Sequence, residues 1–552
     1  MVRQESGNTN PQSERTAFRR SVQYAAALAL CAFAGGAVPL AQSARGQQMG
    51  AGHNSHVDRK VADQIASADA ADNARVIVTL APGAKQRGRI RALLAQGAAV
   101  NEDFTLINAL SADLPVGLLR ALQKHPDVLN ISSDVPVHST GISSSVSGDA
   151  LSSSYTLRNT LGLDSHSPTG AGVTVAVVDS GILLSEKRIL TTRDFTTGAR
   201  NPKNVKALDP YGHGTHVASL IGNDAAGARG IAPEVRYVSL RVLDKNGAGT
   251  TSEVIKALQW AVANKDAYGI DVINLSLGHP VYEPAATDPL VQAVEAAVRA
   301  GIVVVASAGN NGTNPVTDEV GFAGISSPGN APSAITVGAL KTFDTTRRTD
   351  DLIADYSSRG PTWIDGVAKP DIVAPGHKLV AAAATSQTLY TEHPELRVTI
   401  GKQKYLKLSG TSMAAAVVSG SVALMIEEVR AQFGDAPAPN ALKAMLQATA
   451  FPMNDASGTP YHVLVQGAGS VNPAGGLTLA AAIDPTRPVG ASWLTHGVSE
   501  STTIDGQNIV WGDNIVWGDN IVRGDDLLGP LNALSSAFNS DNIVWGNLLA
   551  DN

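Results

Sequence analysis

Three residues of this 552-residue chain have the types that a nucleophilic hydrolase requires, and each lies in a glycine-containing turn. They are Asp179 in VVDSG, His213 in GHGTHVASLIG and Ser412 in SGTSMAAAVVSG. A serine hydroxyl becomes an effective nucleophile when a histidine takes its proton, and a buried carboxylate fixes the tautomer of that histidine. The three residue types together predict acyl transfer through a covalent intermediate.

A developing oxyanion would also need hydrogen-bond donors. Ser412 precedes a long Ala-rich segment, so it lies where a helix N-terminus would offer backbone N–H groups. Asn310, in SAGNNG after the apolar run GIVVVA, offers a side-chain amide as the second donor. The adjacent Asn311 has the same chemistry, and either residue also suits a simple turn, so the residues alone leave this choice open.

Five apolar runs without polar alternation surround these turns, as expected for strands buried on both faces of a parallel sheet. They are residues 173–179, 235–243, 271–278, 301–309 and 334–340. Segments with helical composition alternate with them, at 216–222, 252–265, 290–300 and 412–433. The alternation predicts an α/β domain with a doubly wound, mostly parallel sheet. Its reactive loops are expected at the carboxyl ends of the strands.

A smaller unit precedes this domain. Its segments suggest strands at 75–80, within 104–114 and at 128–132, and helices at 85–96 and 116–124. The order βαββαβ predicts a small α+β domain of the ferredoxin-like type. Residues 45–74 are polar and Ala-rich and are interpreted as a linker. Residues 140–154 are almost entirely Ser, Gly and Thr, which predicts an exposed, protease-sensitive tether.

The first 44 residues have the pattern of an export signal. Arg19 and Arg20 precede an apolar stretch at 24–40, which is followed by small residues at Ala41 and Ala44. The arginine pair also admits a twin-arginine signal, and the stretch is just long enough for an uncleaved anchor. Gly and Pro within it favour cleavage. The protein is therefore predicted to be secreted or located in the cell envelope, with membrane contact only through this segment.

Composition excludes several classes of protein. Hydrophobic residues make up 43% and charged residues only 16%, which is unlike a disordered chain. The formal net charge of −7 provides no basic surface for nucleic acid. The single cysteine, Cys31, lies in the export segment and allows no disulfide within the chain.

The end of the chain is repetitive. NIVWGD or a close variant begins at Asn508, Asn514 and Asn520, and NIVWG recurs at Asn542. We interpret NIVW as a β-prone segment and Gly-Asp-Asn as a turn. A low-complexity tail and a surface-docking or self-associating segment both remain open.

The three reactive turns, with SAGNNG, VINLSLG, YSSRGPT and KPDIVAPG, resemble those of the subtilisin-like serine peptidases (subtilases). The resemblance covers about residues 163–479. It implies that Asp179, His213 and Ser412 are the catalytic triad, that Asn310 and the Ser412 N–H form the oxyanion hole, and that His216 is structural. The substrate-binding residues that it implies are Ser276, Leu277, Gly278, Ala306, Ser307, Ala308 and Gly309.

The resemblance also implies an inhibitory propeptide that assists folding and is then cut off, with the first cleavage between about His138 and Ser154. The expected organisation comprises a signal peptide (1–44), a propeptide region with tether (45–148, folded unit about 75–138), a catalytic domain (149–484) and a tail with NIVWGD repeats (485–552). One departure is Ala416, where family members usually have proline in the first helical turn. Alanine is also a good helix former, so the chemistry should be retained.

The expected function is that of an exported, self-processing serine endopeptidase acting on polypeptides. The chemistry requires no cofactor. Structural calcium is common in relatives, but the sequence indicates no ligand set, and HxxH at His213–His216 is not the HExxH of zinc proteases. Two rival hypotheses are a surface or adhesion module that acts through its tail, and a processing protease with one dedicated substrate.

Overall fold

The structure is a computed structural model. It describes residues 55–140 and 154–511, apart from 96, 199–203, 226–227, 315, 318 and 488–491, together with the strands 514–517 and 520–523. All of these belong to one compact unit, Ala51–Asp551. The predicted export segment and residues 141–153 lie outside the described residues.

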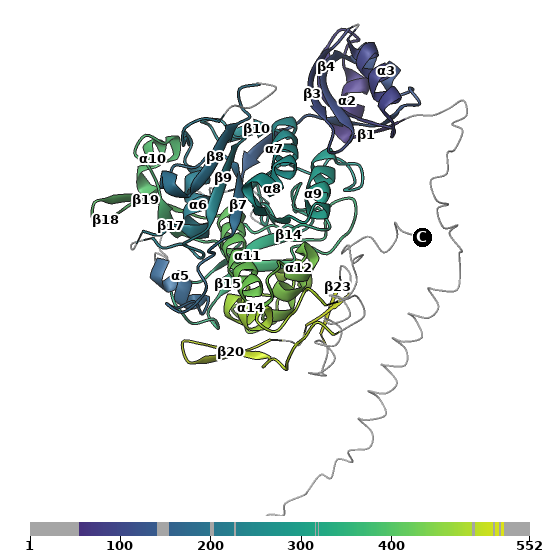
Figure 1. Cartoon of the computed structure of the whole chain (residues 1–552). Helices are drawn as coiled ribbons and strands as arrows, with labels where there is room; N and C mark the ends of the chain where they lie inside the picture. Colours follow the sequence, from purple (N-terminus) through teal and green to yellow (C-terminus); the bar gives the residue numbers. More distant parts are fainter. Residues whose placement is uncertain are drawn as a thin grey trace, which may run out of the picture. The chain divides into compact units, whose positions relative to one another are not determined.

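The large domain, which the sequence predicts to be catalytic and which is called the catalytic region below, has an eight-stranded sheet at its centre (Figure 1). Its strand order is β15 (Leu352–Ile353), β14 (Ile335–Lys341), β13 (Val303–Ser307), β11 (Ile270–Leu275), β7 (Thr174–Asp179), β9 (Arg236–Arg241) and β8 (Ile189–Asp194), and β16 (Ile372–Pro375) also pairs with β14. All pairs are parallel except the one between β14 and β15. The five apolar runs therefore form strands, as the sequence predicts.

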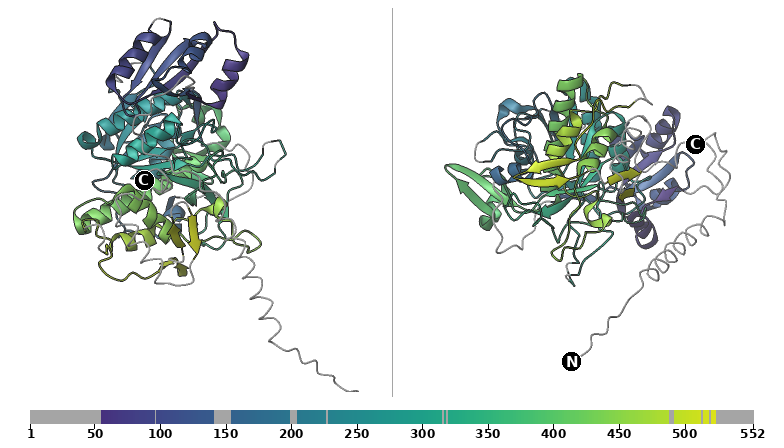
Figure 2. Two further views of the ribbon diagram at one scale, coloured as in Figure 1. Left: turned by 90° about the vertical axis from the view of Figure 1, so that its right-hand side faces the viewer. Right: turned by 90° about the horizontal axis from the view of Figure 1, so that it is seen from below.

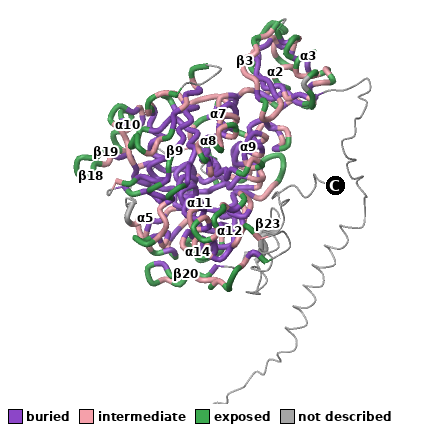
Figure 3. The backbone as a smooth tube through the Cα atoms, in the orientation of Figure 1, coloured by how far each residue is buried: buried purple, intermediate pink, exposed green. Residues whose placement is uncertain are grey.

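Helices cover both faces of this sheet (Figures 1 and 2). One face contacts α6 (His213–Gly222) and α11 (Thr411–Phe433), with α14 (Pro473–Ala480) packed beside α11 and α12 (Pro439–Thr449) beside α14. The other contacts α7 (Thr251–Ala263) and α9 (Pro289–Arg299). Alternate residues of β7 enter two separate cores, Val175 and Val177 in one and Ala176 and Val178 in the other. The fold is thus the predicted doubly wound α/β class, and Figure 3 shows the continuous buried interior.

Sequence features set the helix boundaries near the site. Thr250 and Glu253 form a reciprocal capping box at the start of α7, and the Asp288 carboxylate caps α9. Gly434, at φ 83°, ends α11 in the left-handed conformation. Within the described residues, α11 is the one helix long and apolar enough to span a membrane, but most of it is buried in the core of this domain.

Smaller elements complete the catalytic region. A three-stranded antiparallel sheet has the order β17 (Leu379–Ala382), β19 (Gln403–Leu408), β18 (Arg397–Ile400). The short helices are α5 (Ser154–Thr160), η1 (Glu186–Arg188), α8 (Lys265–Tyr268), α10 (Thr388–Glu392), η2 (Pro394–Leu396) and α13 (Val463–Gln466).

The N-terminal unit is a five-stranded sheet in the order β1 (His56–Val57), β5 (Val128–Ser133), β2 (Asn73–Leu80), β4 (Ala109–Pro115), β3 (Ala99–Phe104). Its helices are α2 (Arg59–Ser67), α3 (Ala84–Leu94) and α4 (Val116–Leu122). From β2 onward the order is the predicted βαββαβ. The predicted run 104–114 proves to be the end of β3, a turn and most of β4.

The interpretation of residues 45–74 as a linker is wrong where the structure describes them. Asp58 caps α2 by accepting a hydrogen bond from the Val61 N–H at 2.6 Å, and the Val61 side chain is fully buried in the core of this unit. The polar, Ala-rich composition hid the helix because it buries only one residue of its own. The folded unit therefore begins at least as early as Ser55 rather than at about residue 75.

The first three repeats contribute strands, as predicted, while the copy at Asn542 lies outside the described residues. β21 (Gln507–Val510) pairs with β20 (Ser501–Ile504), and β22 (Asn514–Trp517) pairs with β23 (Asn520–Arg523). The first hairpin packs on the catalytic region. Trp511 is only 1% exposed, and its Nε1 donates to Thr502 Oγ1 at 2.7 Å. The boundary predicted at residue 484 is therefore too early, because the packed body continues to Trp511.

Candidate active site

Asp179 and His213 come together where β7 ends and α6 begins. His213 Nδ1 lies 2.9 Å from both carboxylate oxygens of Asp179, and both side chains are fully buried. An ionised carboxylate only accepts hydrogen bonds, so this contact assigns the proton to Nδ1 and leaves Nε2 as the basic nitrogen. The arrangement can hold a histidine in the tautomer of a general base.

A buried carboxylate that the sequence analysis missed shapes the turn before α6. Asp209 accepts from Ser180 Oγ at 2.8 Å, from the Gly212 N–H at 2.8 Å and from Thr215 N and Oγ1 at 2.8 and 2.6 Å. Burial raises the pKa of Asp209 above its usual value. Gly212, at φ 109°, lets the chain enter the helix with His213 as its first residue. The Asp-Pro-Tyr-Gly spacing ahead of His213 was the available signal.

His216 lies one turn further along α6 and is fully buried. Its Nε2 is 3.1 Å from the carbonyl oxygens of Leu379 and Leu406, and so carries the proton. Burial, with a smaller effect from His213, lowers the pKa of His216 to about 3. A neutral imidazole bound to two carbonyls cannot serve as a base near neutral pH, which agrees with a structural role.

Ser412 is the second residue of α11, after Gly410. Its Oγ donates to the Ser276 carbonyl at 3.0 Å and lies 2.7 Å from Thr140 Oγ1. His213 Nε2 is buried and has no hydrogen-bond partner among the described residues. The structure therefore does not show a bond between Ser412 and His213. It shows the hydroxyl engaged by a segment from outside the catalytic domain.

Asn310 faces the same segment. Its Nδ2 donates to the Thr140 carbonyl oxygen at 2.5 Å, while its Oδ1 accepts from Thr411 N and Oγ1, both at 3.0 Å. Asn311 is turned elsewhere, with Nδ2 on the Gly324 carbonyl. Of the two amides left open by the residues alone, Asn310 is thus the one aimed at a carbonyl beside Ser412. Thr411, which fixes it, was missed.

The segment in the cleft is β6 (Pro136–Ser139), extended by Thr140. It lies antiparallel between β10 (Ala248–Thr250) and β12 (Leu277–Gly278) as the middle strand of three. The Thr140 N–H donates to the Ser276 carbonyl at 3.2 Å. Backbone pairing on both sides fixes the register, so the Thr140 carbonyl is placed at the side chain of Asn310.

The predicted substrate-binding residues divide into two groups. Leu277 and Gly278 pair with β6, the Ser276 carbonyl accepts from Thr140, and Ser307 Oγ accepts from Thr140 Oγ1 at 2.8 Å. Ala306 and Ala308 are buried in and beside β13, and the Gly309 N–H bonds to Thr411 Oγ1 at 3.2 Å. A cavity of about 350 Å³ beside Thr140 is lined by Gly278, Asn310, Asn311 and Ser326, among others.

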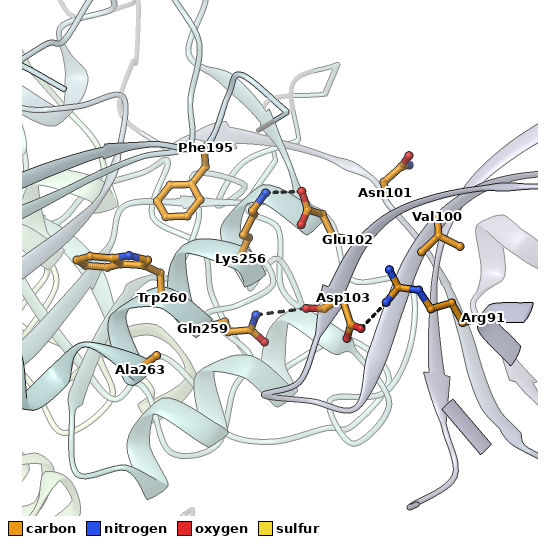
Figure 4. A pocket seen from close by; sticks show the side chains of 10 residues that line it. All are labelled: Arg91, Val100, Asn101, Glu102, Asp103, Phe195, Lys256, Gln259, Trp260 and Ala263. Carbon is orange, nitrogen blue, oxygen red and sulfur yellow. Dashed lines mark hydrogen bonds and ion pairs between the residues drawn. The ribbon is translucent and has the colours of Figure 1, made fainter. Parts of the chain in front are cut away.

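The N-terminal unit contacts α7 and the loop before α9. Glu102 and Lys256 form an ion pair, and Gln259 Nε2 donates to the Asp103 carbonyl at 3.3 Å (Figure 4). Asp134 accepts from Ser252 N and Oγ at the start of α7, at 2.8 and 2.7 Å. Asn130 Nδ2 donates to Glu283 Oε2 at 2.9 Å. These contacts hold the N-terminal unit on the catalytic region just ahead of the segment that leads into the cleft.

Metal-binding groups were sought across the described residues. No group of three or more His, Cys, Asp or Glu side chains there could hold a metal ion. Calcium therefore remains without an assigned ligand set.

Comparisons with known proteins agree with this architecture. A model of the subtilase family matches residues 170–473. Serine protease AprX of Bacillus subtilis is 39% identical over 272 residues, which are 47% of this chain and 58% of AprX. Subtilisin E of the same species is 31% identical over 339 residues, which are 60% of this chain and 74% of that protein.

Among solved structures, fervidolysin from Fervidobacterium pennivorans, "a keratinolytic enzyme related to subtilisin", has the same fold. The TM-score is 0.59 at 19% identity, over 84% of this chain and 67% of fervidolysin. The family model covers more than half of this chain, and the match to subtilisin E covers most of that protein. The chain therefore belongs to the subtilase family, the subtilisin-like serine endopeptidases.

Proposed function

We propose that this chain is an exported zymogen that hydrolyses peptide bonds through an acyl-enzyme and removes its own propeptide. The observation that supports this best is the path of residues 136–140 through the cleft. The segment is paired on both sides, its last carbonyl is held by Asn310 Nδ2, and Ser412 Oγ lies beside its last side chain. A substrate cut at this site would bind in the same way, so the bond proposed for first cleavage is Thr140–Gly141.

The proposed reaction begins when the Ser412 hydroxyl turns from the Ser276 carbonyl to His213 Nε2, the buried nitrogen without a partner. His213 takes the proton as Ser412 Oγ attacks the Thr140 carbonyl carbon. Asp179 stabilises the imidazolium, and Asn310 donates to the developing oxyanion. His213 then protonates the Gly141 amine, which leaves, and a water molecule releases the acyl group by the reverse proton movements.

The N-terminal unit is proposed to act as an inhibitor in the same chain. Its contacts with α7 and with the loop before α9 do not involve the scissile bond, so they would survive cleavage. The cut propeptide would then keep residues 136–140 in the cleft until it dissociates or is degraded.

The test is to compare processing of the wild-type chain and Ser412→Ala. Wild type should yield a mature chain whose N-terminal sequence begins at Gly141, and a fluorophosphonate probe should label it. Ser412→Ala should keep residues 140 and 141 joined and remain unlabelled.

Ser421→Ala is the matched control. Ser421 is buried on the same helix and donates only within it, to the Val417 carbonyl at 2.9 Å. It should process like wild type. Equal processing of Ser412→Ala and wild type, in a preparation free of other proteases, would contradict self-cleavage.

A further inference from the structure

Ser307 has a buried hydroxyl in an otherwise apolar run of sequence. It is the last residue of β13, in the run VVVASA, and it is 1% exposed. Its flanking residues Ala306 and Ala308 are fully buried. Within the described residues, the one hydrogen bond of the Ser307 side chain is the one that its Oγ accepts from Thr140 Oγ1, at 2.8 Å.

A buried hydroxyl without a partner is costly, because it loses its bonds to water and gains nothing in return. Thr140 supplies the partner in the zymogen, but Thr140 belongs to the segment that is cut. With substrate bound, Ser307 Oγ therefore has this donor only when the residue in this position has a hydroxyl group of its own.

We propose that Ser307 selects substrates with threonine or serine immediately before the scissile bond. The inference rests on the proposed function, because it treats Thr140 as the occupant of that position. Valine has nearly the same shape as threonine but cannot donate to Ser307 Oγ. A site built to bond a hydroxyl discriminates strongly against an analogue that lacks it, since the buried polar group is left unpaired.

The hydroxyl of Thr140 has a second neighbour, Ser412 Oγ, at 2.7 Å. A preference for threonine could therefore arise through Ser412 rather than through Ser307. Removing the Ser307 hydroxyl separates the two sources, because that change leaves both Thr140 Oγ1 and Ser412 Oγ in place.

The experiment uses the mature enzyme, obtained from the full chain, and quenched fluorescent peptides based on residues 134–146. The position of Thr140 is occupied in turn by Thr, Ser, Val and Ala. Wild type should cleave the Thr peptide about tenfold or more faster than the Val peptide, in kcat/KM. In Ser307→Ala this ratio should fall to near one, mainly because the rate on Thr falls.

Ser421→Ala is the matched control. Ser421 is also a fully buried serine, but it does not line the cavity beside Thr140, and its hydroxyl donates to the Val417 carbonyl at 2.9 Å. It should leave the Thr to Val ratio unchanged. Labelling by a fluorophosphonate probe checks that Ser307→Ala has an intact site.

Three outcomes are distinguishable. A Thr to Val ratio that is the same in wild type and Ser307→Ala overturns the proposal and assigns the preference to Ser412. Equal cleavage of all four peptides by wild type overturns it while leaving the endopeptidase function in place. Failure of wild type to cleave any peptide or to take up the probe would instead contradict the proposed function.

Discussion

Asn310 can hold a carbonyl oxygen because the other end of the same amide is already fixed. Thr411 donates to Asn310 Oδ1 through both its N–H and its Oγ1, so Nδ2 is directed into the cleft. Thr411 Oγ1 also accepts from the Gly309 N–H at 3.2 Å, which ties the loop after β13 to the start of α11. A preorganised donor costs no rearrangement when charge develops on the oxygen.

Thr411→Val should therefore lower kcat/KM about tenfold, because the amide of Asn310 loses one of the two bonds that orient it. The loss should fall mainly on kcat, since the backbone pairing of substrate with β10 and β12 is unchanged. Thr411→Ser retains the hydroxyl and should stay close to wild type. Peptide kinetics on both variants check this, and an equal loss in Thr411→Ser would show that packing of the methyl group, rather than the hydroxyl, is responsible.

The residue types at the site could be predicted from the sequence, but several partners could not. Asp179, His213, Asn310 and Ser412 stand out because glycine-containing turns follow or precede apolar runs. Thr411 and Asp209 act through hydrogen bonds to residues distant in sequence, and no local pattern marks such contacts. The role of Thr140 was hidden in a run of Ser, Gly and Thr that was interpreted only as a tether.

At the scale of elements, the loop before α9 should make docking of the N-terminal unit depend on pH, because it contains the buried carboxyl group of Glu283. Glu283 accepts from Asn130 Nδ2 and is 4% exposed, with His56 Nδ1 at 3.9 Å. Burial, followed by the charge of Asp288, raises the pKa of Glu283 to about 8. Docking of the N-terminal unit, the proposed propeptide, therefore favours the protonated form of this carboxyl group.

Docking should weaken as the pH rises. Release of the N-terminal unit removes part of the burial of Glu283, so its pKa should fall from about 8 toward the ordinary value of 4.5, and docking should take up protons within this pH window. Across this window the inhibition constant of the cut propeptide should rise by up to tenfold per pH unit, and it should level off above pH 8. The check is peptidase activity of the freshly processed complex as a function of pH.

Glu283→Gln should flatten that dependence, because the amide does not titrate. Glu295→Gln, a change on α9 at a residue that instead bonds Ser333, should leave it as in wild type. A slope that persists in Glu283→Gln would assign the effect to another group.

The strands and helices were predicted well where the sheet is buried on both faces. The strands of the large sheet carry continuous apolar runs, and the helices between them were recognised by their composition. Helix α2 was missed because its single buried residue, Val61, gives no periodic signal. The extension of the packed body to Trp511 was missed because its hairpin belongs to a repeat, which suggested a separate tail.

At the scale of the whole molecule, this hairpin decides where the enzyme ends. Ile504 and Ile509 lie in one core cluster with Leu340, Val373 and Phe451 of the catalytic region. Gly475 lies so close to Trp511 that a Cβ atom there would be 3.0 Å from the indole nitrogen. The first NIVW copy is thus part of the catalytic body.

A chain that ends at residue 499 should therefore be less stable than one that ends at residue 511 by about 3 kcal/mol or more of unfolding free energy. The shorter chain uncovers the apolar cluster and loses the Trp511 contacts. Thermal or urea unfolding of inactive Ser412→Ala versions measures this without self-digestion. Equal stability of the two truncations would contradict a structural role for the hairpin.

The truncated chain that ends at residue 511 also distinguishes the hypothesis that the protein acts as an enzyme from the hypothesis that it acts in adhesion. Loss of a surface phenotype in the chain that ends at 511, with casein hydrolysis intact, would assign adhesion to the later repeats. The chain that ends at residue 499 cannot be used for this test, because removal of the first repeat also destabilises the catalytic region.

The three-stranded arrangement of β10, β6 and β12 has a consequence for what the enzyme can digest. The position of the middle strand accepts only an extended segment whose backbone groups are free to form hydrogen bonds with a strand on each side. A helix, or a strand already paired within its own sheet, does not meet that condition. Compact proteins would thus be protected by their native conformation, whatever their sequence. Heat-unfolded proteins and long surface loops would be degraded first.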